Sequence, residues 1–147
     1  MATRSTTHFV SSFFNSRAII YVHHDGYPSE GGERVLRFLE TVRDKVPQSS
    51  TRFNDNSLTA TRFAVFMFHR YLDNKKAYPM PGKNIDNYHV LDTISVAVVD
   101  SDPGDIEYRY IVLCDEIEED GTPKVIVESV WDGWKRDAKD MRAKGWI

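Results

Sequence analysis

A strand-breaking segment near the N-terminus constrains the fold more than any other part of this sequence. Residues 25–28 read Asp-Gly-Tyr-Pro, and they separate an apolar run at residues 17–24 from a helix-like run at residues 29–46. Proline cannot donate a hydrogen bond to a strand ladder, and glycine permits unusual backbone angles. The segment therefore predicts a junction between a strand and a helix.

The runs on the N-terminal side of this junction predict two strands. Residues 19–22 read Ile-Ile-Tyr-Val, so residues 17–24 are apolar on both faces, which is typical of a central strand. Residues 6–14 are rich in threonine, valine and phenylalanine and predict a preceding strand. We expect the two to pair as an antiparallel hairpin.

Two helices are expected after the junction. In residues 29–46, apolar side chains recur at spacings of three and four, Ser29 is the candidate N-cap, and Pro47 ends the run. Residues 58–74 form a second helical pattern that is apolar almost all round. Such a helix is normally buried on several sides.

Three strands are predicted in the second half, at residues 91–99, 107–115 and 124–131. The connections at residues 100–105 and 118–123 carry aspartate, glycine and proline and resemble hairpin turns. The order ββααβββ predicts the α+β class, with an antiparallel sheet of about five strands and two helices packed on it. Its length of 147 residues suits one domain spanning residues 1–147.

Composition excludes several classes of protein. With 19 basic and 22 acidic residues the formal net charge is -3, so nucleic acid is not the expected partner. The single cysteine, Cys114, excludes an intrachain disulfide and a multi-cysteine zinc site, and its apolar neighbours indicate a buried side chain. No apolar run approaches the roughly 20 residues of a membrane helix. Residues 1–5 lack the core of a secretory signal, so we expect a cytoplasmic protein.

The junction itself holds the candidate site. If the strand continued through it, His23 and Asp25 would share one side, while His24 would face the other. The two histidines would then point apart and could not readily bind one metal ion. A carboxylate beside an imidazole is half of an acid–base unit, but it is equally what a structural network needs. We favour the structural interpretation.

Gly31 and Gly32 fall in the first turn of the expected helix, where backbone N–H groups lack intrahelical partners and could bind a small anion. The alternative, which we favour slightly, is that these glycines relieve crowding. With His23 and Asp25, three further residues complete the predicted contact surface: Gly26, Tyr27 and Ser29. The sequence predicts no cofactor and no metal site.

The tail, residues 132–147, predicts either a short helix packed by Trp134 or an extension of the last strand. It is basic and aromatic, which would suit nucleic acid or an acidic protein. Interspersed aspartates dilute the charge, and a solvated amphipathic helix is the interpretation we favour.

Two segments resemble a family of small uncharacterised tailed-phage and prophage proteins. Residues 3–6 read Thr-Arg-Ser-Thr, and residues 20–29 read Ile-Tyr-Val-His-His-Asp-Gly-Tyr-Pro-Ser. The family pattern is Ile-Tyr-Cys-His-Trp-Asp-Gly-Tyr-Pro, so Val22 replaces a cysteine and His24 replaces a tryptophan. A thiol at that place is therefore not needed here. The resemblance covers the first third of the chain and implies a phage-type protein acting inside a bacterial cell.

Three hypotheses about function follow. The first is a binding module that contacts a host or defence factor, as in counter-defence, or a small anionic ligand. The second is a small hydrolase or nucleotide-processing enzyme that uses His23 and Asp25. The third is a virion-associated structural protein. The absence of a complete catalytic constellation in the sequence favours the first.

Overall fold

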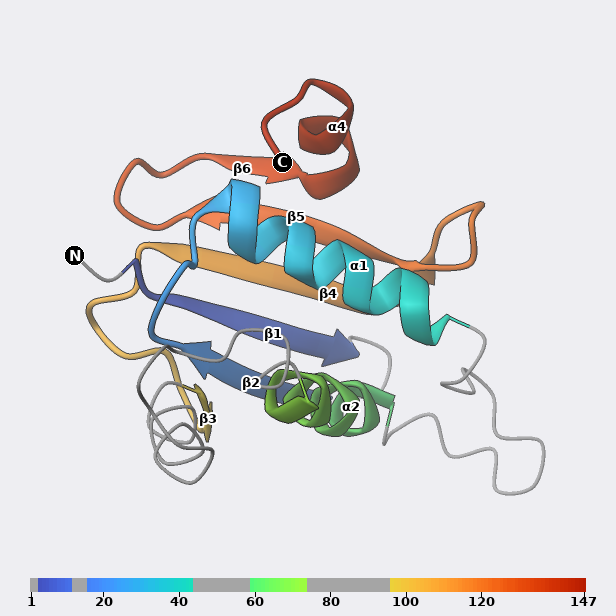
Figure 1. Ribbon diagram of the computed structural model, residues 1–147, viewed down its shortest axis with the longest axis horizontal. Helices are drawn as coiled ribbons and strands as arrows, with labels where there is room; N and C mark the ends of the chain where they lie inside the picture. Colours follow the sequence, from blue (N-terminus) through green and yellow to red (C-terminus); the bar gives the residue numbers. More distant parts are fainter. Residues whose placement is uncertain (1–2, 12–15, 44–58, 74–95) are drawn as a thin grey trace, which may run out of the picture.

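Six strands form one mixed sheet in the order β3-β2-β1-β4-β5-β6 (Figure 1). The computed structural model describes residues 3–11, 16–43, 59–73 and 96–147. The strands are β1 (Ser5–Ser11), β2 (Ser16–Val22), β3 (Val96–Val99), β4 (Tyr108–Ile117), β5 (Pro123–Ser129) and β6 (Lys135–Asp137). The helices are a π-helical turn η1 (Pro28–Gly32), α1 (Glu33–Val42), α2 (Thr59–Asp73) and α4 (Ala138–Ala143).

Most neighbouring strands of the sheet are antiparallel. The predicted α+β class is confirmed, and so are the hairpins β1–β2 and β4–β5. One pair is parallel, because the central strand β1 lies beside β4 with Ser5 opposite Tyr108. The sheet is therefore mixed, whereas an antiparallel sheet of about five strands was expected.

The segment between β3 and β4 differs from its prediction as a hairpin turn. β3 pairs with β2, so strands β2 and β1 lie between β3 and β4. β3 and β4 therefore run parallel to each other. Parallel strands need a connection that returns across the sheet. Residues 100–107 make this return, and we call them the crossover. Of the strand predicted at residues 91–99, residues 91–95 lie outside the described residues.

Helices α1 and α2 cover one face of the sheet (Figure 1). Phe9, fully buried on β1, packs against both helices. Its ring stacks on Phe63 of α2 at 5.9 Å between centroids and meets Phe38 of α1 edge-on at 6.3 Å. The predicted apolar stripe of α1 is confirmed. On α2, however, Val65 and Phe66 are exposed, so the described part of this helix is buried on fewer sides than expected.

The start of the first helix differs in detail from the prediction. Ser29 does not cap it; Tyr27 holds the N-cap position with an extended backbone, and Pro28 occupies the first helical position. Proline suits that place because it has no N–H to leave unpaired. The predicted end near residue 46 lies outside the described residues.

The tail combines the two alternatives left open by the sequence. It first adds β6 to the edge of β5 and then forms α4. The side chain of Asp137 caps α4 by accepting hydrogen bonds from the backbone N–H groups of Lys139 and Asp140. Ala138 and Met141 are buried in the core that the sheet shares with α1.

Candidate functional site at the strand-to-helix junction

The backbone of the junction, residues 23–32, is held from two sides at Gly26. The Gly26 N–H donates a hydrogen bond of 2.9 Å to the Thr3 carbonyl, and the Gly26 carbonyl accepts one of 2.6 Å from the Tyr110 hydroxyl. Asp25 turns the chain between β2 and Gly26 with a positive φ of 56°. Asparagine and aspartate tolerate this region better than most residues do. The junction is therefore fixed both to the segment that precedes β1 and to β4.

Close packing accounts for the glycines. A Cβ atom at Gly31 would lie 2.9 Å from the Gly26 carbonyl oxygen and 3.0 Å from the Tyr110 hydroxyl. At Gly32 it would lie 2.9 Å from Cδ1 of Ile147. The geometry agrees with the interpretation that these glycines relieve crowding.

The start of η1 gives little room for an anion. The backbone N–H groups of Glu30 and Gly31 donate to the Tyr27 carbonyl, at 3.0 and 2.8 Å. Gly31 and Gly32 are buried, and the side chain of Glu30 is exposed beside them. Two of the donors that a helix start could offer to an anion are therefore already used.

The predicted contact residues separate into an inner and an outer group. Gly26, Gly31 and Gly32 are buried. The exposed side chains of the junction are His24, Asp25, Tyr27, Ser29 and Glu30, and His23 is half-buried. The junction thus presents polar side chains on a backbone whose interior is tightly packed.

The histidines are arranged differently from the prediction. β2 ends at Val22, so strand alternation does not extend through the junction. The rings of His23 and His24 meet edge-on with centroids 4.6 Å apart, and the expectation that they point away from each other is wrong. Within the described residues, no hydrogen bond or ion pair joins His23 to Asp25. The partner of His23 is Tyr21, whose hydroxyl lies 2.6 Å from Nδ1 in a hydrogen bond.

The electrostatics of the junction favour a neutral His23. Desolvation and the charges of His24 and Arg4 lower the pKa of His23 from its ordinary value, although Asp105 acts in the opposite direction. A neutral imidazole can accept or donate a hydrogen bond and carries no charge that would repel a cationic partner.

A polar network on the opposite face of the sheet from α1 and α2, here the outer face, was not predicted. Side chains alternate between the two faces along β1. Phe9 faces the helices, so Thr6 and His8 lie on the outer face. Both donate to Oδ1 of Asp102 in the crossover, at 2.6 Å each. Arg109 donates to the other oxygen, Oδ2, at 2.7 Å from Nε, and also pairs with Glu128. We call these five residues the outer-face network.

The network is partly buried, and its polar groups pair with one another. Burial lowers the pKa of His8 and outweighs the neighbouring Asp102 carboxylate, which favours a neutral imidazole. For Asp102, burial raises the pKa, but hydrogen bonds from Thr6, His8 and Arg109 outweigh it and the net shift is downward. A carboxylate that already accepts this many hydrogen bonds is a structural anchor rather than a reactive base. The alternation of Thr6 and His8 was the available sequence signal.

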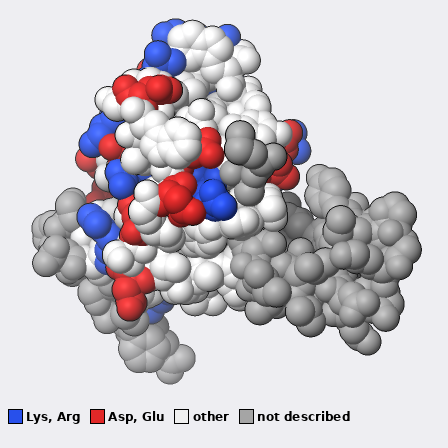
Figure 2. Space-filling model, turned by 90° about the vertical axis from the view of Figure 1, so that its left-hand side faces the viewer, with Lys and Arg blue, Asp and Glu red and all other residues white. Residues whose placement is uncertain are grey.

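The side of the molecule that carries the junction has no dominant charge. Figure 2 shows acidic and basic side chains interspersed on the part of this side that the structure describes. Among the described residues, no group of three or more His, Cys, Asp or Glu is arranged to hold a metal ion. None of the described helices is long and apolar enough to cross a membrane.

The site and the sheet define an α+β protein with a mostly antiparallel six-stranded sheet and a braced strand-to-helix junction. No protein-family model, curated protein or solved structure matches this chain.

Proposed function

We propose that this protein is a binding module, a phage-type accessory protein whose junction contacts a host or defence protein inside a bacterial cell. The observation that supports this most is the contrast within the junction. Its glycines are buried and its backbone is fixed at Gly26, whereas the side chains of His24, Asp25 and Tyr27 are exposed. Exposed groups on a fixed backbone lose little conformational entropy when they bind.

The side chains fit a protein partner better than a small anion. Tyrosine combines a large apolar ring with a hydroxyl and is enriched where proteins meet. The alternative ligand would need free backbone donors, and the Glu30 and Gly31 N–H groups are bonded to the Tyr27 carbonyl. The exposed carboxylates of Asp25 and Glu30 would also repel an anion.

The cellular setting of this proposal comes from the resemblance of residues 3–6 and 20–29 to small phage proteins. A counter-defence role is one form of it, in which the bound partner is a component of the host's defence. Cytoplasmic location belongs to the same proposal.

The test is a quantitative pull-down from bacterial lysate with the wild-type protein and with Tyr27→Ala. The structure supplies a matched control in Glu119→Ala, because Glu119 is exposed in the β4–β5 turn at the other end of the sheet (Figure 1). A true partner is enriched by the wild type and by Glu119→Ala and is lost with Tyr27→Ala. The purified partner should then bind about tenfold or more weakly to Tyr27→Ala, as expected for an interface tyrosine.

Two results would contradict the proposal. One is a lysate in which no protein distinguishes Tyr27→Ala from the control. The other is a thermal shift of the wild type by inorganic phosphate or a nucleotide, which would favour the small anion. Gly31→Val is unsuited to that second test, because its side chain would collide with the Gly26 carbonyl.

A hydrolytic or nucleotide-processing activity at His23 is the second candidate, and the hydrogen bond between Tyr21 and His23 is the observation that favours it. Tyr21 would orient the imidazole in place of Asp25. Activity on a panel of phosphate esters that disappears in both His23→Gln and Tyr21→Phe, with an unchanged thermal midpoint, would establish this reading. Loss of activity in neither variant would end it.

A further inference from the structure

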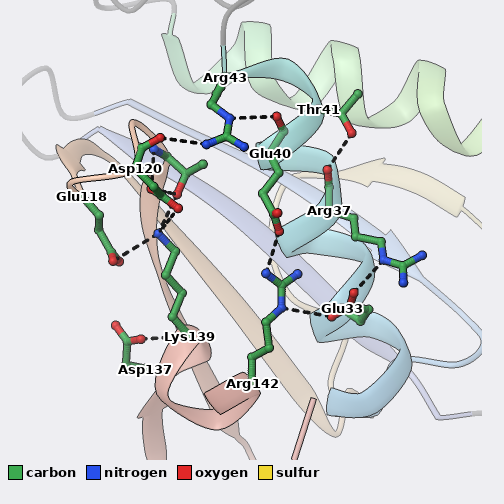
Figure 3. A network of polar contacts seen from close by, with 11 residues as sticks. Glu33, Arg37, Glu40, Thr41, Arg43, Glu118, Asp120, Asp137, Lys139 and Arg142 are labelled. Carbon is green, nitrogen blue, oxygen red and sulfur yellow. Dashed lines mark hydrogen bonds and ion pairs between the residues drawn. The ribbon is translucent and has the colours of Figure 1, made fainter. Parts of the chain in front are cut away.

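The basic side chains of the tail fall into two groups that differ in their partners. Lys139 and Arg142 lie on the side of α4 that faces α1 and the β4–β5 turn (Figure 3). Lys139 Nζ is 3.2 Å from Glu118 and 2.8 Å from Asp120. Arg142 bridges Glu33 at 3.3 Å and Glu40 at 2.7 Å. These two cations are neutralised and hold α4 in place.

The other group has no acidic partner among the described residues. Lys135, Arg136 and Lys144 are all exposed, and the ion pairs of the described chain include none of them. Arg136 and Lys144 lie against tryptophans, whereas Lys135 faces the other side of the sheet, because neighbouring residues of a strand alternate between its faces. The Arg136 guanidinium lies over the rings of Trp134 and Trp146, with Cζ at 4.5 and 4.8 Å from the two centroids. Lys144 lies over Trp146 at 5.1 Å.

These ring contacts hold the guanidinium without neutralising its charge. Arg136 is exposed and forms no ion pair among the described residues, so its N–H groups remain available to a partner. Planar, bidentate recognition by a guanidinium suits a carboxylate.

Exposed apolar surface accompanies these cations. Trp146 is 47% exposed. An isolated exposed tryptophan needs no explanation, but Trp146 lies against two cations, Arg136 and Lys144, that form no ion pair among the described residues. We define the tryptophan–arginine surface as Trp134, Arg136, Lys144 and Trp146.

This surface adjoins the junction. Ile147, next to Trp146 in the chain, packs its side chain against Gly32 of η1. Figure 1 likewise places the end of the chain beside the start of α1. A partner that contacts Tyr27 could therefore extend over Trp146 and Arg136.

We propose that the tryptophan–arginine surface binds an acidic peptide segment, with Arg136 and Lys144 contacting its carboxylates and the exposed part of Trp146 packing against an apolar side chain. This proposal rests on the proposed function only in that the protein is a binding module. The net charge of -3 in the whole chain makes this locally positive surface stand apart.

Single-stranded nucleic acid would also use cations and aromatic rings, but the geometry fits it less well. Bases bind by stacking on free ring faces. Arg136 covers a face of Trp134 and of Trp146, and Lys144 lies over Trp146 as well.

The test measures fluorescence anisotropy of a labelled peptide in which glutamates alternate with leucines, at low ionic strength. A peptide with glutamine in place of glutamate controls for the role of charge. A labelled oligothymidylate of the same charge tests whether single-stranded nucleic acid binds instead. The variants are Arg136→Glu and Lys144→Glu. Arg17→Glu is the matched control, because Arg17 is an exposed cation on β2, away from the tail.

The expected result is salt-sensitive binding of the glutamate peptide that falls about tenfold or more in Arg136→Glu and Lys144→Glu and is unchanged in Arg17→Glu. Arg136→Lys should bind with intermediate affinity, because it keeps the charge and loses the planar stack. The inference is overturned if the wild type does not bind the peptide, if Arg17→Glu weakens binding equally, or if the oligothymidylate binds more tightly.

Failure here is distinguishable from failure of the proposed function. Tyr27→Ala removes a junction side chain and leaves the tryptophan–arginine surface intact, so it should retain the peptide. If the lysate test at Tyr27 fails while the peptide result holds, the module binds through the tail alone. If the peptide result fails while the Tyr27 partner is confirmed, the junction alone is the contact surface.

Discussion

The hydroxyl of Tyr110 donates a hydrogen bond of 2.6 Å to the carbonyl of Gly26, and this contact ties the junction to the centre of the sheet. Tyr110 is almost fully buried on β4, and the same hydroxyl lies where a side chain at Gly31 would have to go. One phenol therefore holds Gly26 in place and fills the space that a side chain at Gly31 would need.

Replacing Tyr110 with phenylalanine should lower the free energy of unfolding by about 1–3 kcal/mol, because it leaves the buried Gly26 carbonyl without this donor. Urea denaturation followed by circular dichroism measures the effect. Tyr108→Phe is the matched control on the same strand, since Tyr108 is only partly buried and should change stability by less than about 0.5 kcal/mol. Equal losses in the two variants would remove the special role of Tyr110.

Gly26→Ala should be strongly unfavourable. Its Cβ would lie 2.7 Å from Cβ of Ser5 and 2.8 Å from the Thr3 carbonyl, and overpacking of this kind costs about 1–3 kcal/mol. Gly104→Ala is the control, because nothing lies within 4 Å of its added methyl group. Thermal melts of the two variants should therefore diverge, and an unchanged midpoint for Gly26→Ala would contradict the packing described for the junction.

Protonation of His8 should couple stability to pH. Its pKa is lowered in the folded protein from an ordinary 6.5, so below that pH the unfolded chain binds a proton more readily than the folded one. The free energy of unfolding is then expected to fall as the pH decreases from 6.5 through the lowered pKa. His8→Gln should flatten this slope, measured by urea denaturation at several pH values. The slope that remains belongs partly to His23, whose pKa is also lowered.

The attachment of α4 should depend more on apolar burial than on ion pairs. Met141 is buried in the core, and its replacement by alanine should cost about 2–5 kcal/mol. Arg142 bridges two carboxylates but is partly exposed, so Arg142→Ala should cost only about 0.5–1 kcal/mol. Chemical denaturation of both variants gives the comparison. The reverse order would show that the ion pairs of Figure 3 dominate.

The local elements could be predicted because each depends on a short pattern. The apolar stripe of α1 and the strands β1 and β2 appear in the sequence as spacing and alternation. The partner of β3 could not be predicted in this way. A Pro-Gly pair such as Pro103-Gly104 reverses the chain equally well in a hairpin and in a crossover.

Long-range contacts limited the prediction of the site. His8 and Asp102 are 94 positions apart, and only the crossover brings them together. β6 is made of Lys135, Arg136 and Asp137, residues with no preference for strands, and it exists because the edge of β5 offers hydrogen-bonding partners. At the junction, the sequence identified the residue types but not the directions of their side chains, because β2 ends before His23 and strand alternation stops there.

The parallel pairing of β1 with β4 has a consequence for the order in which the protein is made. Ribosomal synthesis releases the β1–β2 hairpin early, but the strand that must lie against the other side of β1 emerges only after the crossover. Thr6 and Asp102, which are 96 positions apart, cannot meet before then. During that interval β1, with its Thr-, Val- and Phe-rich sequence, presents an unpaired edge to other chains. Expression yield should therefore be limited by association of nascent chains rather than by the stability of the finished fold.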